Sequence, residues 1–239
     1  MVSPFTGSGS TLSYVSYHMP RVVPSERRSA RGRIVRLCVI GDSPDVRRYA
    51  VALVAQGHQV YWLASTETLR TLHNEATQLT VAPDILPATC QYVVPVQTYH
   101  YEGIRLVCVN QEFWQHPDLH TRLFTYISLF QRALPCAVLH TWGPWRIAYL
   151  AIYIARFLAV PAVLSYSSQL VSARLEQPFL WDWVLRQVAA VIVSSPAEQE
   201  RLLALAPLDL RQVHVLAPRQ PHLGPILTAL YARLRAATS

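Results

Sequence analysis

The sequence has 239 residues, of which 51% are hydrophobic and 15% are charged, and its formal net charge is +7. This composition provides enough apolar surface for a sizeable core and excludes a disordered chain, and the length suits one large domain or two small ones. All of the basic residues are arginine, because the sequence contains no lysine.

The first 32 residues are rich in Ser, Pro, Gly and Arg and predict a basic, flexible N-terminal arm. Six arginines and one glutamate give residues 1–36 a net charge of +5. Such an arm favours an anionic partner, either an acidic protein face or an anionic membrane surface, and we prefer the protein. The arginines expected to make these contacts are Arg21, Arg27, Arg28, Arg31 and Arg33.

The opening residues, "MVSPFTGSGSTLSY", lack the charged and apolar regions of a secretory signal. We therefore expect a cytoplasmic protein and leave peripheral membrane association open. The strongest candidate for a membrane span, residues 147–164, contains Arg156 and Pro161. Its apolar helical part is shorter than the roughly 20 residues that a span needs, so we interpret it as a buried helix followed by a buried strand.

From Arg33 onward, short apolar runs alternate with helical periods. The runs that predict strands are 34–41, 59–65, 90–96, 104–110, 136–142, 161–167, 190–195 and 213–218. The periods that predict helices are 46–56, 67–78, 117–133, 145–158, 179–188, 197–206 and 225–236. This alternation predicts an α/β fold: one doubly wound, mostly parallel, Rossmann-like sheet that is covered on both faces. The third and fourth runs are close enough to pair instead as a hairpin.

In an open parallel sheet, ligands bind at the carboxyl ends of the strands. The first strand is followed by "GDSPD", in which Asp42, Ser43 or Asp45 can cap the next helix. The early N–H groups of that helix are suited to a phosphate, but the two aspartates place negative charge there and the dinucleotide fingerprint GxGxxG is absent. We therefore favour a capped helix start over a nucleotide site.

The fifth predicted strand is followed by "HTWGPW". His140, Trp142 and Trp145 could present aromatic faces and an imidazole to a sugar ring or a base, or the tryptophans could pack against the arm or a partner. His140 as a catalytic base is disfavoured, because no carboxylate partner can be identified from the sequence.

Later strand ends carry hydroxyl groups. Tyr166 and its neighbouring serines follow the sixth strand, and Ser194 and Ser195 follow the seventh, where either serine can cap a helix with Glu198 as its capping-box partner. The "WDW" that follows Leu180 lies on a predicted helix, so Trp181 and Trp183 face different sides. We expect one of them in the core and the other on the surface.

The four cysteines, Cys38, Cys90, Cys108 and Cys136, are far apart in apolar runs and predict buried reduced thiols. The chain has no CxxC or Cys/His cluster, so no metal site is expected. It has no P-loop, HExxH or GxSxG motif either. Nucleic-acid binding is also disfavoured, because charge outside the arm is nearly balanced and no known module is present.

Four segments in order resemble the N-terminal, acceptor-side domain of the GT-B glycosyltransferases of the retaining family that includes sucrose and glycogen synthases. The resemblance covers residues 34–218 and is carried by "RYAVALVAQGHQVYWLAS", "VLHTWGPWRIAYLAIYIARFLAVPAVLSYS", "VLRQVAAVIVSSPAEQERLLAL" and "QVHVLAPRQP". It implies a Rossmann-like domain over residues 33–221.

The chain departs from the family pattern at the positions that would touch a ligand. The family's Gly-Gly turn is Gly41-Asp42 here, its second histidine after the fifth strand is Trp142 although His140 matches the first, and its next histidine is Tyr166. After Pro221 the chain goes directly into a segment that resembles the last helix of these enzymes, without the nucleotide-sugar domain. We expect residues 222–239 to form a helix that packs back on the domain.

The resemblance and its departures predict a non-catalytic glycosyltransferase-like domain that serves as a binding or scaffold subunit. The alternative is the acceptor-binding half of a two-subunit glycosyltransferase, and a nucleotide-binding enzyme of another kind is a weaker third. No catalytic residue and no cofactor are expected. The candidates for ligand or partner binding are Gly41, Asp42, Ser43, His140, Trp142, Trp145, Tyr166 and Ser194. Partner contact is expected through the arm and the Trp-rich edge at 140–145.

Overall fold

The computed structural model describes residues 35–75, 78–83, 96–110, 118–133, 135–142, 145–166, 178–206 and 208–237. All of these residues belong to one compact unit, Ile34–Ser239. The predicted arm at 1–32 and its five arginines lie outside the described residues.

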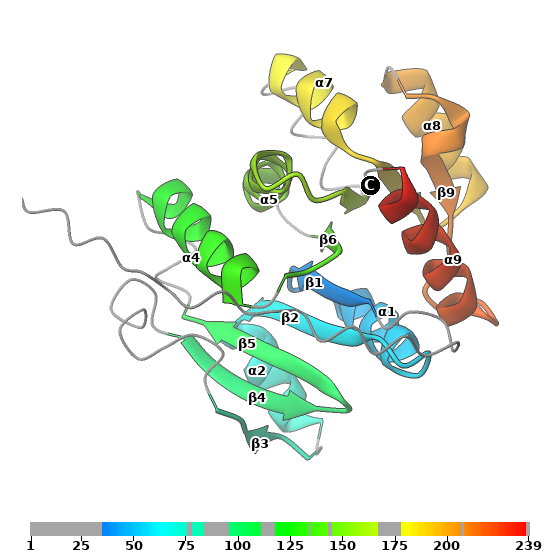
Figure 1. Cartoon of the computed structure of the whole chain (residues 1–239). Helices are drawn as coiled ribbons and strands as arrows, with labels where there is room; N and C mark the ends of the chain where they lie inside the picture. The colour runs from blue at the N-terminus through cyan, green and yellow to red at the C-terminus, as the bar shows by residue number, and fades with distance from the viewer. Residues whose placement is uncertain are drawn as a thin grey trace, which may run out of the picture. The chain divides into compact units, whose positions relative to one another are not determined.

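The described strands form a single sheet in the order β3-β4-β5-β2-β1-β6-β7-β8-β9 (Figure 1). The strands are β1 (Arg36–Ile40), β2 (Gln59–Ser65), β3 (Thr80–Val81), β4 (Val96–Tyr101), β5 (Ile104–Val109), β6 (Val138–Thr141), β7 (Ala162–Ser165), β8 (Ala190–Val193) and β9 (Val213–Val215). Neighbouring strands are parallel except at β3–β4 and β4–β5. This arrangement confirms the predicted fold class.

The antiparallel pair β4–β5 is a hairpin, but its first strand lies later in the chain than predicted, because residues 97–101, expected to connect the runs 90–96 and 104–110, belong to β4. Tyr101 pairs with Ile104, and the two residues between them, Glu102 and Gly103, have φ values of 48° and 79°. Two successive residues with positive φ are typical of the type I′ turn, whose twist matches a two-residue hairpin. The strand starts at Val96, so the run predicted at 90–96 lies almost entirely outside the described residues.

Every predicted helix is present, with ends shifted by a few residues. The helices are α1 (Pro44–Val54), α2 (Thr66–Asn74), α4 (Leu119–Ala133), α5 (Trp145–Phe157), α7 (Pro178–Gln187), α8 (Pro196–Leu205) and α9 (Leu223–Ala236), with a 3-10 turn at Leu210–Gln212. In the described part of the chain, no helix is long and apolar enough to cross a membrane.

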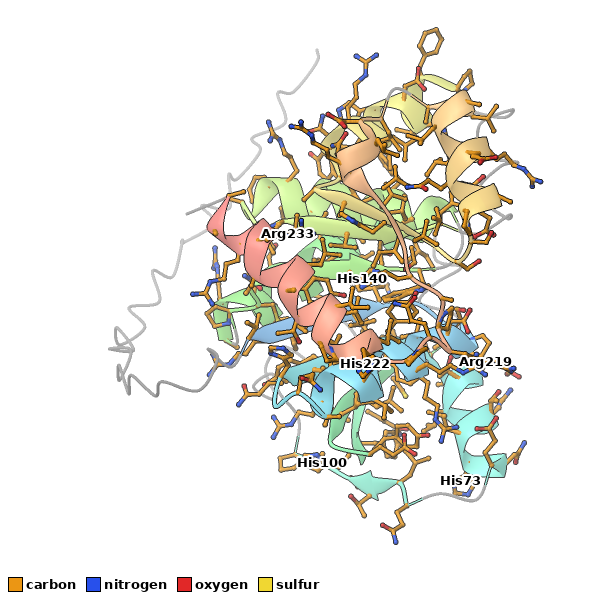
Figure 2. All side chains as sticks on the ribbon, turned by 90° about the vertical axis from the view of Figure 1, so that its right-hand side faces the viewer. His73, His100, His140, Arg219, His222 and Arg233 are labelled. Atoms are coloured by element: carbon orange, nitrogen blue, oxygen red, sulfur yellow. The ribbon has the colours of Figure 1, made fainter. Side chains whose placement is uncertain are left out.

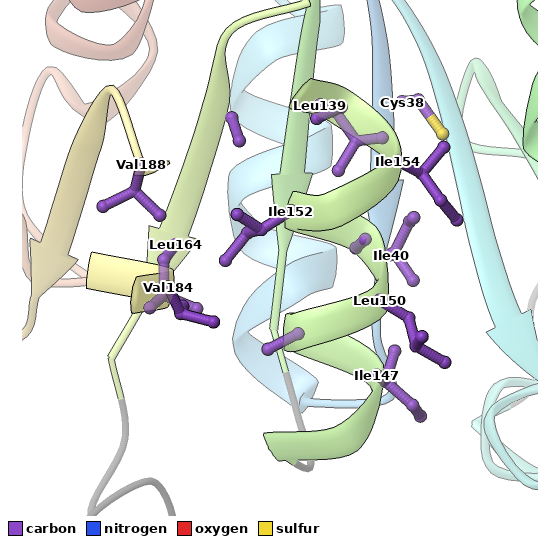
Figure 3. Close-up of a cluster of buried hydrophobic side chains, with 14 of the residues drawn as sticks. Cys38, Ile40, Leu139, Ile147, Leu150, Ile152, Ile154, Leu164, Val184 and Val188 are labelled. Carbon is purple, nitrogen blue, oxygen red and sulfur yellow. The ribbon is translucent and has the colours of Figure 1, made fainter. Parts of the chain in front are cut away.

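One face of the sheet is covered by α4, α5, α7 and α8, which precede or connect the parallel strands β6 to β9. Figure 3 shows α5 over this face, with Leu150 and Ile154 close to Ile40 and Leu139 of the strands beneath. Helix α5 packs on the sheet with α4 and α7 on either side, so its inner side is buried, whereas Tyr153, Arg156 and Phe157 on its outer side are exposed. The apolar segment 147–164 is a helix followed by the buried strand β7, as predicted, but only the inner side of the helix is buried.

The opposite face is covered in two different ways. Helices α1 and α2 follow β1 and β2 and cover that half of the sheet, whereas the helices that follow β6, β7 and β8 all lie on the other face. The apolar residues Val163 of β7 and Ile192 of β8 would therefore face water. Helix α9 returns from the end of β9 and covers them with Leu227 and Tyr231.

Helix α9 is held close against α1 by small residues and one hydrogen bond. A Cβ atom at Gly224 would lie 2.5 Å from the backbone oxygen of Ala52, so only glycine permits this approach. Farther along, Nε2 of His58 lies 2.8 Å from Oγ1 of Thr228. Burial lowers the pKa of His58, so this histidine is neutral in the fold.

Candidate functional site

The order of the strands reverses at β1, which lies between β2 and β6. In an open α/β sheet, the carboxyl ends of the two strands at this switch point enclose the usual ligand crevice. Gly41, Asp42 and Ser43 follow β1, and Trp142 follows β6. The switch point thus brings together four of the residues that the sequence singled out.

Gly41 is required by the approach of Trp142. Its φ is 145°, and a Cβ atom there would lie 2.6 Å from the carbonyl oxygen of Trp142. The N–H of Trp142 donates to the oxygen of Ile40 at 2.7 Å, which extends the pairing of β1 with β6 past the strand ends. The oxygen of Gly41 accepts a hydrogen bond from Nε1 of Trp62 at 2.7 Å. Because Gly41 has no side chain, the backbone of Trp142 can pack against this turn, and the space is not left for a ligand.

Asp42 and Ser43 are both engaged in local hydrogen bonds. Oδ1 of Asp42 accepts from the N–H of Ser65 and from Oγ1 of Thr68, each at 2.7 Å, and so joins the end of β1 to the start of α2. Ser43 is the N-cap of α1, and its hydroxyl accepts from the N–H of Asp45 at 3.3 Å. The predicted capped helix start is confirmed, with Ser43 as the cap.

His140 lies in the interior, behind α9 (Figure 2), and is 1% exposed. Its Nδ1 lies 2.5 Å from the hydroxyl of Tyr231, and its Nε2 lies 2.9 Å from Oγ of Ser165. Burial lowers the pKa of His140 well below its usual range and raises that of Tyr231 well above it. The pair is therefore a neutral imidazole hydrogen-bonded to a neutral phenol.

Trp142 is buried, and the expectation that it would be accessible at the sheet edge is wrong. Its ring lies 3.5 Å from that of His140 between centroids, and Tyr49 meets it edge-on at 5.2 Å. His140 and Trp142 are two residues apart, so both point to the same face of the sheet, beneath α1 and α9. The interior cluster thus consists of Tyr49, His140, Trp142 and Tyr231. The side chain of Trp145 lies outside the described residues.

Tyr166 and Ser194 lie at the ends of β7 and β8, away from the interior cluster. Tyr166 is buried against Trp181, with ring centroids 6.4 Å apart, and burial raises the pKa of its hydroxyl. The N–H and hydroxyl of Ser194 donate to Oε2 of Glu198 at 2.8 and 2.6 Å. Ser195 is the N-cap of α8, and its hydroxyl accepts from the N–H of Glu198 at 3.3 Å. The predicted capping box is therefore only half formed, because the carboxylate of Glu198 bonds Ser194 and not the N–H of Ser195.

A cleft that the sequence did not predict opens beside the start of α1. Its volume is about 940 Å³, and it is lined by α1, α2 and residues 218–224. Arg219 and His222 lie on the segment that leads into α9 (Figure 2). The sequence could not predict that residues 218–224 line a cleft, because their position depends on where α9 docks. The one available signal was the polar run "PRQPH" that follows β9.

The charges that line this cleft are largely paired. Arg47 bonds Glu75 and, at 3.0 Å, Glu102, and Arg48 bonds Asp45 at 2.8 Å. Arg219 has no ion-pair partner among the residues that the structure describes. The cleft therefore offers one unpaired cation close to Asp42 and Ser43.

Metal and thiol chemistry find no support in the described ranges. No group of three His, Cys, Asp or Glu side chains there is arranged to hold a metal ion. Cys38, Cys108 and Cys136 are buried and form no disulfide, as predicted for core thiols, and Cys90 lies outside the described residues. Burial raises the pKa of Cys108 to about 12, which keeps it a protonated thiol at neutral pH.

The sequence matches the family described as "Glycosyl transferase 4-like domain" over residues 41–219, which is more than half of the chain. A search of curated proteins found no significant match. Among solved structures, the chain is similar to sucrose-phosphate synthase from Thermosynechococcus elongatus. The TM-score is 0.54 at 16% identity, over 83% of this chain and 98% of that one.

The chain is also similar to two UDP-GlcNAc 2-epimerases. For the protein from Methanocaldococcus jannaschii the TM-score is 0.52 at 9% identity, over 83% of this chain and 49% of that one. For UDP-N-acetylglucosamine 2-epimerase from Rickettsia bellii the TM-score is 0.51 at 7% identity, over 84% of this chain and 48% of that one. The chain thus spans about half the length of these epimerases, and at such identities the likeness concerns the fold.

Proposed function

The chain belongs to the glycosyl transferase 4-like domain family, and on this premise we propose that it is a non-catalytic member that acts as a binding or scaffold subunit of a larger assembly. Its fold is that of a GT-B N-terminal domain, as the sequence motifs predicted. The finer proposal rests on what occupies the switch point between β1 and β6.

One observation carries this proposal: Trp142 occupies the place where the ligand crevice of such a sheet would open. Trp142 is 5% exposed; its indole packs on Tyr49 and His140, and its backbone lies against Gly41. An imidazole that acts as a general base must reach the reacting group, and His140 is held instead between Tyr231 and Ser165 inside the domain. Catalysis also requires a donor positioned next to the acceptor.

The connection from β9 to α9 supports the same proposal. Only residues 216–222 separate the two elements, and α9 then packs directly on α1 and β6. In the family that the sequence resembles, the nucleotide-sugar domain stands between these two elements. The described residues therefore supply one side of a donor–acceptor cleft and no second side.

Titration calorimetry of the full chain with UDP-glucose, UDP-GlcNAc and GDP-mannose tests the proposal. We expect no saturable heat at ordinary concentrations, because Asp42 and Asp45 place negative charge at the start of α1, where a phosphate would bind. A one-to-one binding curve with a micromolar dissociation constant would contradict the proposal, since it would require a working donor site in this chain.

The cleft beside α1 favours a second candidate, the acceptor-binding half of a two-subunit glycosyltransferase. Its volume of about 940 Å³ is in the range of small-molecule sites, and it lies next to the carboxyl edge of the sheet. Ligand-observed NMR with a panel of mono- and disaccharides tests this candidate. Binding that is weakened in Arg219→Ala but unchanged in Arg211→Ala would favour the half-enzyme, and no binding by any sugar would remove it.

The two candidates also differ in the partner that they require. A scaffold subunit binds a protein that is not a glycosyltransferase, through its basic arm on an acidic face, whereas a half-enzyme binds a chain with a donor domain. Co-purification of the tagged full chain followed by mass spectrometry separates them. Loss of the partner on deletion of residues 1–32, and at high salt, is the result expected for an electrostatic anchor.

A further inference from the structure

The outer sides of α5 and α7 carry a group of aromatic side chains that the proposed function does not use. We name it the outer group; its members are Tyr149, Tyr153, Phe157 and Trp183. The two helices are neighbours over one face of the sheet (Figure 1). No member of the outer group lines the cleft beside α1, so a contact made here is independent of the proposed function.

The rings of the outer group contact one another across the two helices. Tyr149 of α5 meets Trp183 of α7 with ring centroids 5.6 Å apart, and Tyr153 lies 6.3 Å from each of them. Phe157 lies one turn after Tyr153 on the same side of α5, because residues four apart share one side of a helix. The outer group is therefore one surface rather than four isolated side chains.

Much of this surface faces water. Phe157 is 66% exposed and Tyr153 is 36% exposed, whereas Tyr149 and Trp183 are half-buried. Helical spacing places Phe179, which is 91% exposed, one turn before Trp183 on the same side of α7. Single exposed apolar residues are ordinary, but a contiguous exposed group is typical of an interaction surface.

Charges of both signs lie beside Trp183 on α7. Asp182 is half-buried and Arg186 is exposed, and the spacing of the two residues would allow an ion pair within the helix. Across the described ranges, neither of them forms an ion pair. An unpaired carboxylate and an unpaired guanidinium are therefore both available to a partner at this surface.

We propose that the outer group is the contact surface of a symmetric dimer, in which α5 and α7 of one copy of the chain pack against the same helices of a second copy. In a two-fold dimer a surface contacts itself, so it must be its own complement. A two-fold axis beside the middle of α7 makes the two copies of this helix antiparallel. Asp182 of each copy then lies opposite Arg186 of the other, with Trp183 close to the axis.

The mixture of charges favours a second copy over other occupants. An anionic bilayer or an acidic protein would attract Arg186 and Arg156 but would place Asp182 against charge of its own sign. A second copy supplies an opposite charge to both Asp182 and Arg186. Arg156, in the last turn of α5, then lies at the polar rim that surrounds the aromatic core of a typical interface.

Sedimentation velocity of the full chain over a range of concentrations tests the proposal. The natural protein is expected to be a dimer at micromolar concentration and to dissociate on dilution. The variant Phe157→Ser, Phe179→Ser should raise the dissociation constant about tenfold or more, because it removes apolar contact area from both copies. Since both side chains are exposed in the single chain, the variant should keep the melting temperature of the dilute, monomeric protein.

A charge swap tests whether the occupant is a second copy. Asp182→Arg and Arg186→Asp each bring like charges together across the two-fold axis, so each should raise the dissociation constant about tenfold or more. The double variant Asp182→Arg, Arg186→Asp exchanges the charges in both copies and should dimerise within about threefold of the natural protein. An equal mixture of the two single variants should dimerise as well, because one supplies two arginines and the other two aspartates.

Matched controls lie elsewhere on the surface. Leu210→Ser removes an apolar side chain that is 62% exposed, and Arg211→Asp reverses a charge beside it. Both controls should keep the dissociation constant of the natural protein, because neither residue lies on α5 or α7.

Three results would overturn the proposal. The first is a natural protein that is monomeric at every concentration. The second is a dimer whose dissociation constant is unchanged by the phenylalanine variant or by the single charge variants, which would place the contact on another part of the chain. The third is a loss of dimer in the single charge variants that neither the double variant nor the mixture restores, because a two-fold contact between Asp182 and Arg186 requires that recovery.

Discussion

Two groups of aromatic side chains in this molecule have opposite environments. The interior cluster of Tyr49, His140, Trp142 and Tyr231 is closed off beneath α1 and α9. The outer group of Tyr149, Tyr153, Phe157 and Trp183 lies on the outer sides of α5 and α7, where its rings are exposed or half-buried. Both groups contain a tryptophan from a short motif, Trp142 from "HTWGPW" and Trp183 from "WDW". Trp142 at the end of a central strand is therefore buried more deeply than Trp183 on a helix.

The largest expected difference between the two groups is in stability. Trp142→Ala should lower the free energy of unfolding by about 3–5 kcal/mol, because it empties a closed space between β1, β6 and two helices. The surface variant Phe157→Ser, Phe179→Ser replaces side chains that are 66% and 91% exposed and should change the free energy of unfolding by no more than about 0.5 kcal/mol. Urea unfolding followed by circular dichroism measures both.

Equal losses in these two variants would break the comparison. A small loss in Trp142→Ala would mean that the indole is not part of the core, and the argument that it closes the switch point would fall with it. A large loss of stability in the surface variant would mean that Phe157 and Phe179 support the fold although they are exposed.

The next effect concerns the helix that closes the interior cluster. Gly224→Ala places a Cβ atom against the backbone oxygen of Ala52, and such overpacking costs about 1–3 kcal/mol. Displacing α9 should also move Tyr231 away from His140, so amide hydrogen exchange in β6 should become faster. Ile226→Ala, at a position of the same helix that is 40% exposed, is the control and should leave exchange in β6 unchanged.

The smallest expected effect is a dependence of stability on pH. Burial lowers the pKa of His140, so the folded chain does not bind a proton that the unfolded chain binds near pH 6.5. The free energy of unfolding should therefore fall as the pH decreases below about 6.5, by up to about 1.4 kcal/mol per pH unit from this residue. His58 and His214, whose pKa values burial also lowers, should add to the slope.

His140→Gln isolates the contribution of His140. Unfolding by urea at a series of pH values between about 7 and 5 should give a flatter slope in this variant than in the natural protein. An unchanged slope would show that His140 binds its proton in the folded state, and the interior cluster would then be open to water.

The fold could be predicted because its elements are strongly periodic. Continuous apolar runs such as 59–65 predicted strands buried on both faces, and β2 has the predicted bounds. The helix N-caps could also be predicted, because Ser43 and Ser195 are each followed by a proline and then by an acidic residue in the first turn, a pattern typical of a capped helix start. Such signals are local, so they do not depend on which elements later meet.

The site could not be predicted to the same extent, because it depends on contacts between distant parts of the chain. Trp142 follows a strand at the ligand edge, and only the docking of α9 and the packing of Tyr49 determine that it is buried. The cleft lined by Arg219 and His222 depends on the same docking. The different environments of Trp181, which is buried, and Trp183, which is half-buried, could be predicted, because helical spacing alone places the two residues on different sides of α7.

The position of α9 has a consequence for how this protein is made. The helix forms from residues 223–236 but covers α1, β6, β7 and β8, which are synthesised long before it. On the ribosome, Val163 and Ile192 on one face of the nascent sheet therefore remain exposed to solvent until α9 has been synthesised. We expect the growing chain to expose this apolar surface from the synthesis of β7 until α9 arrives and to bind chaperones during that interval.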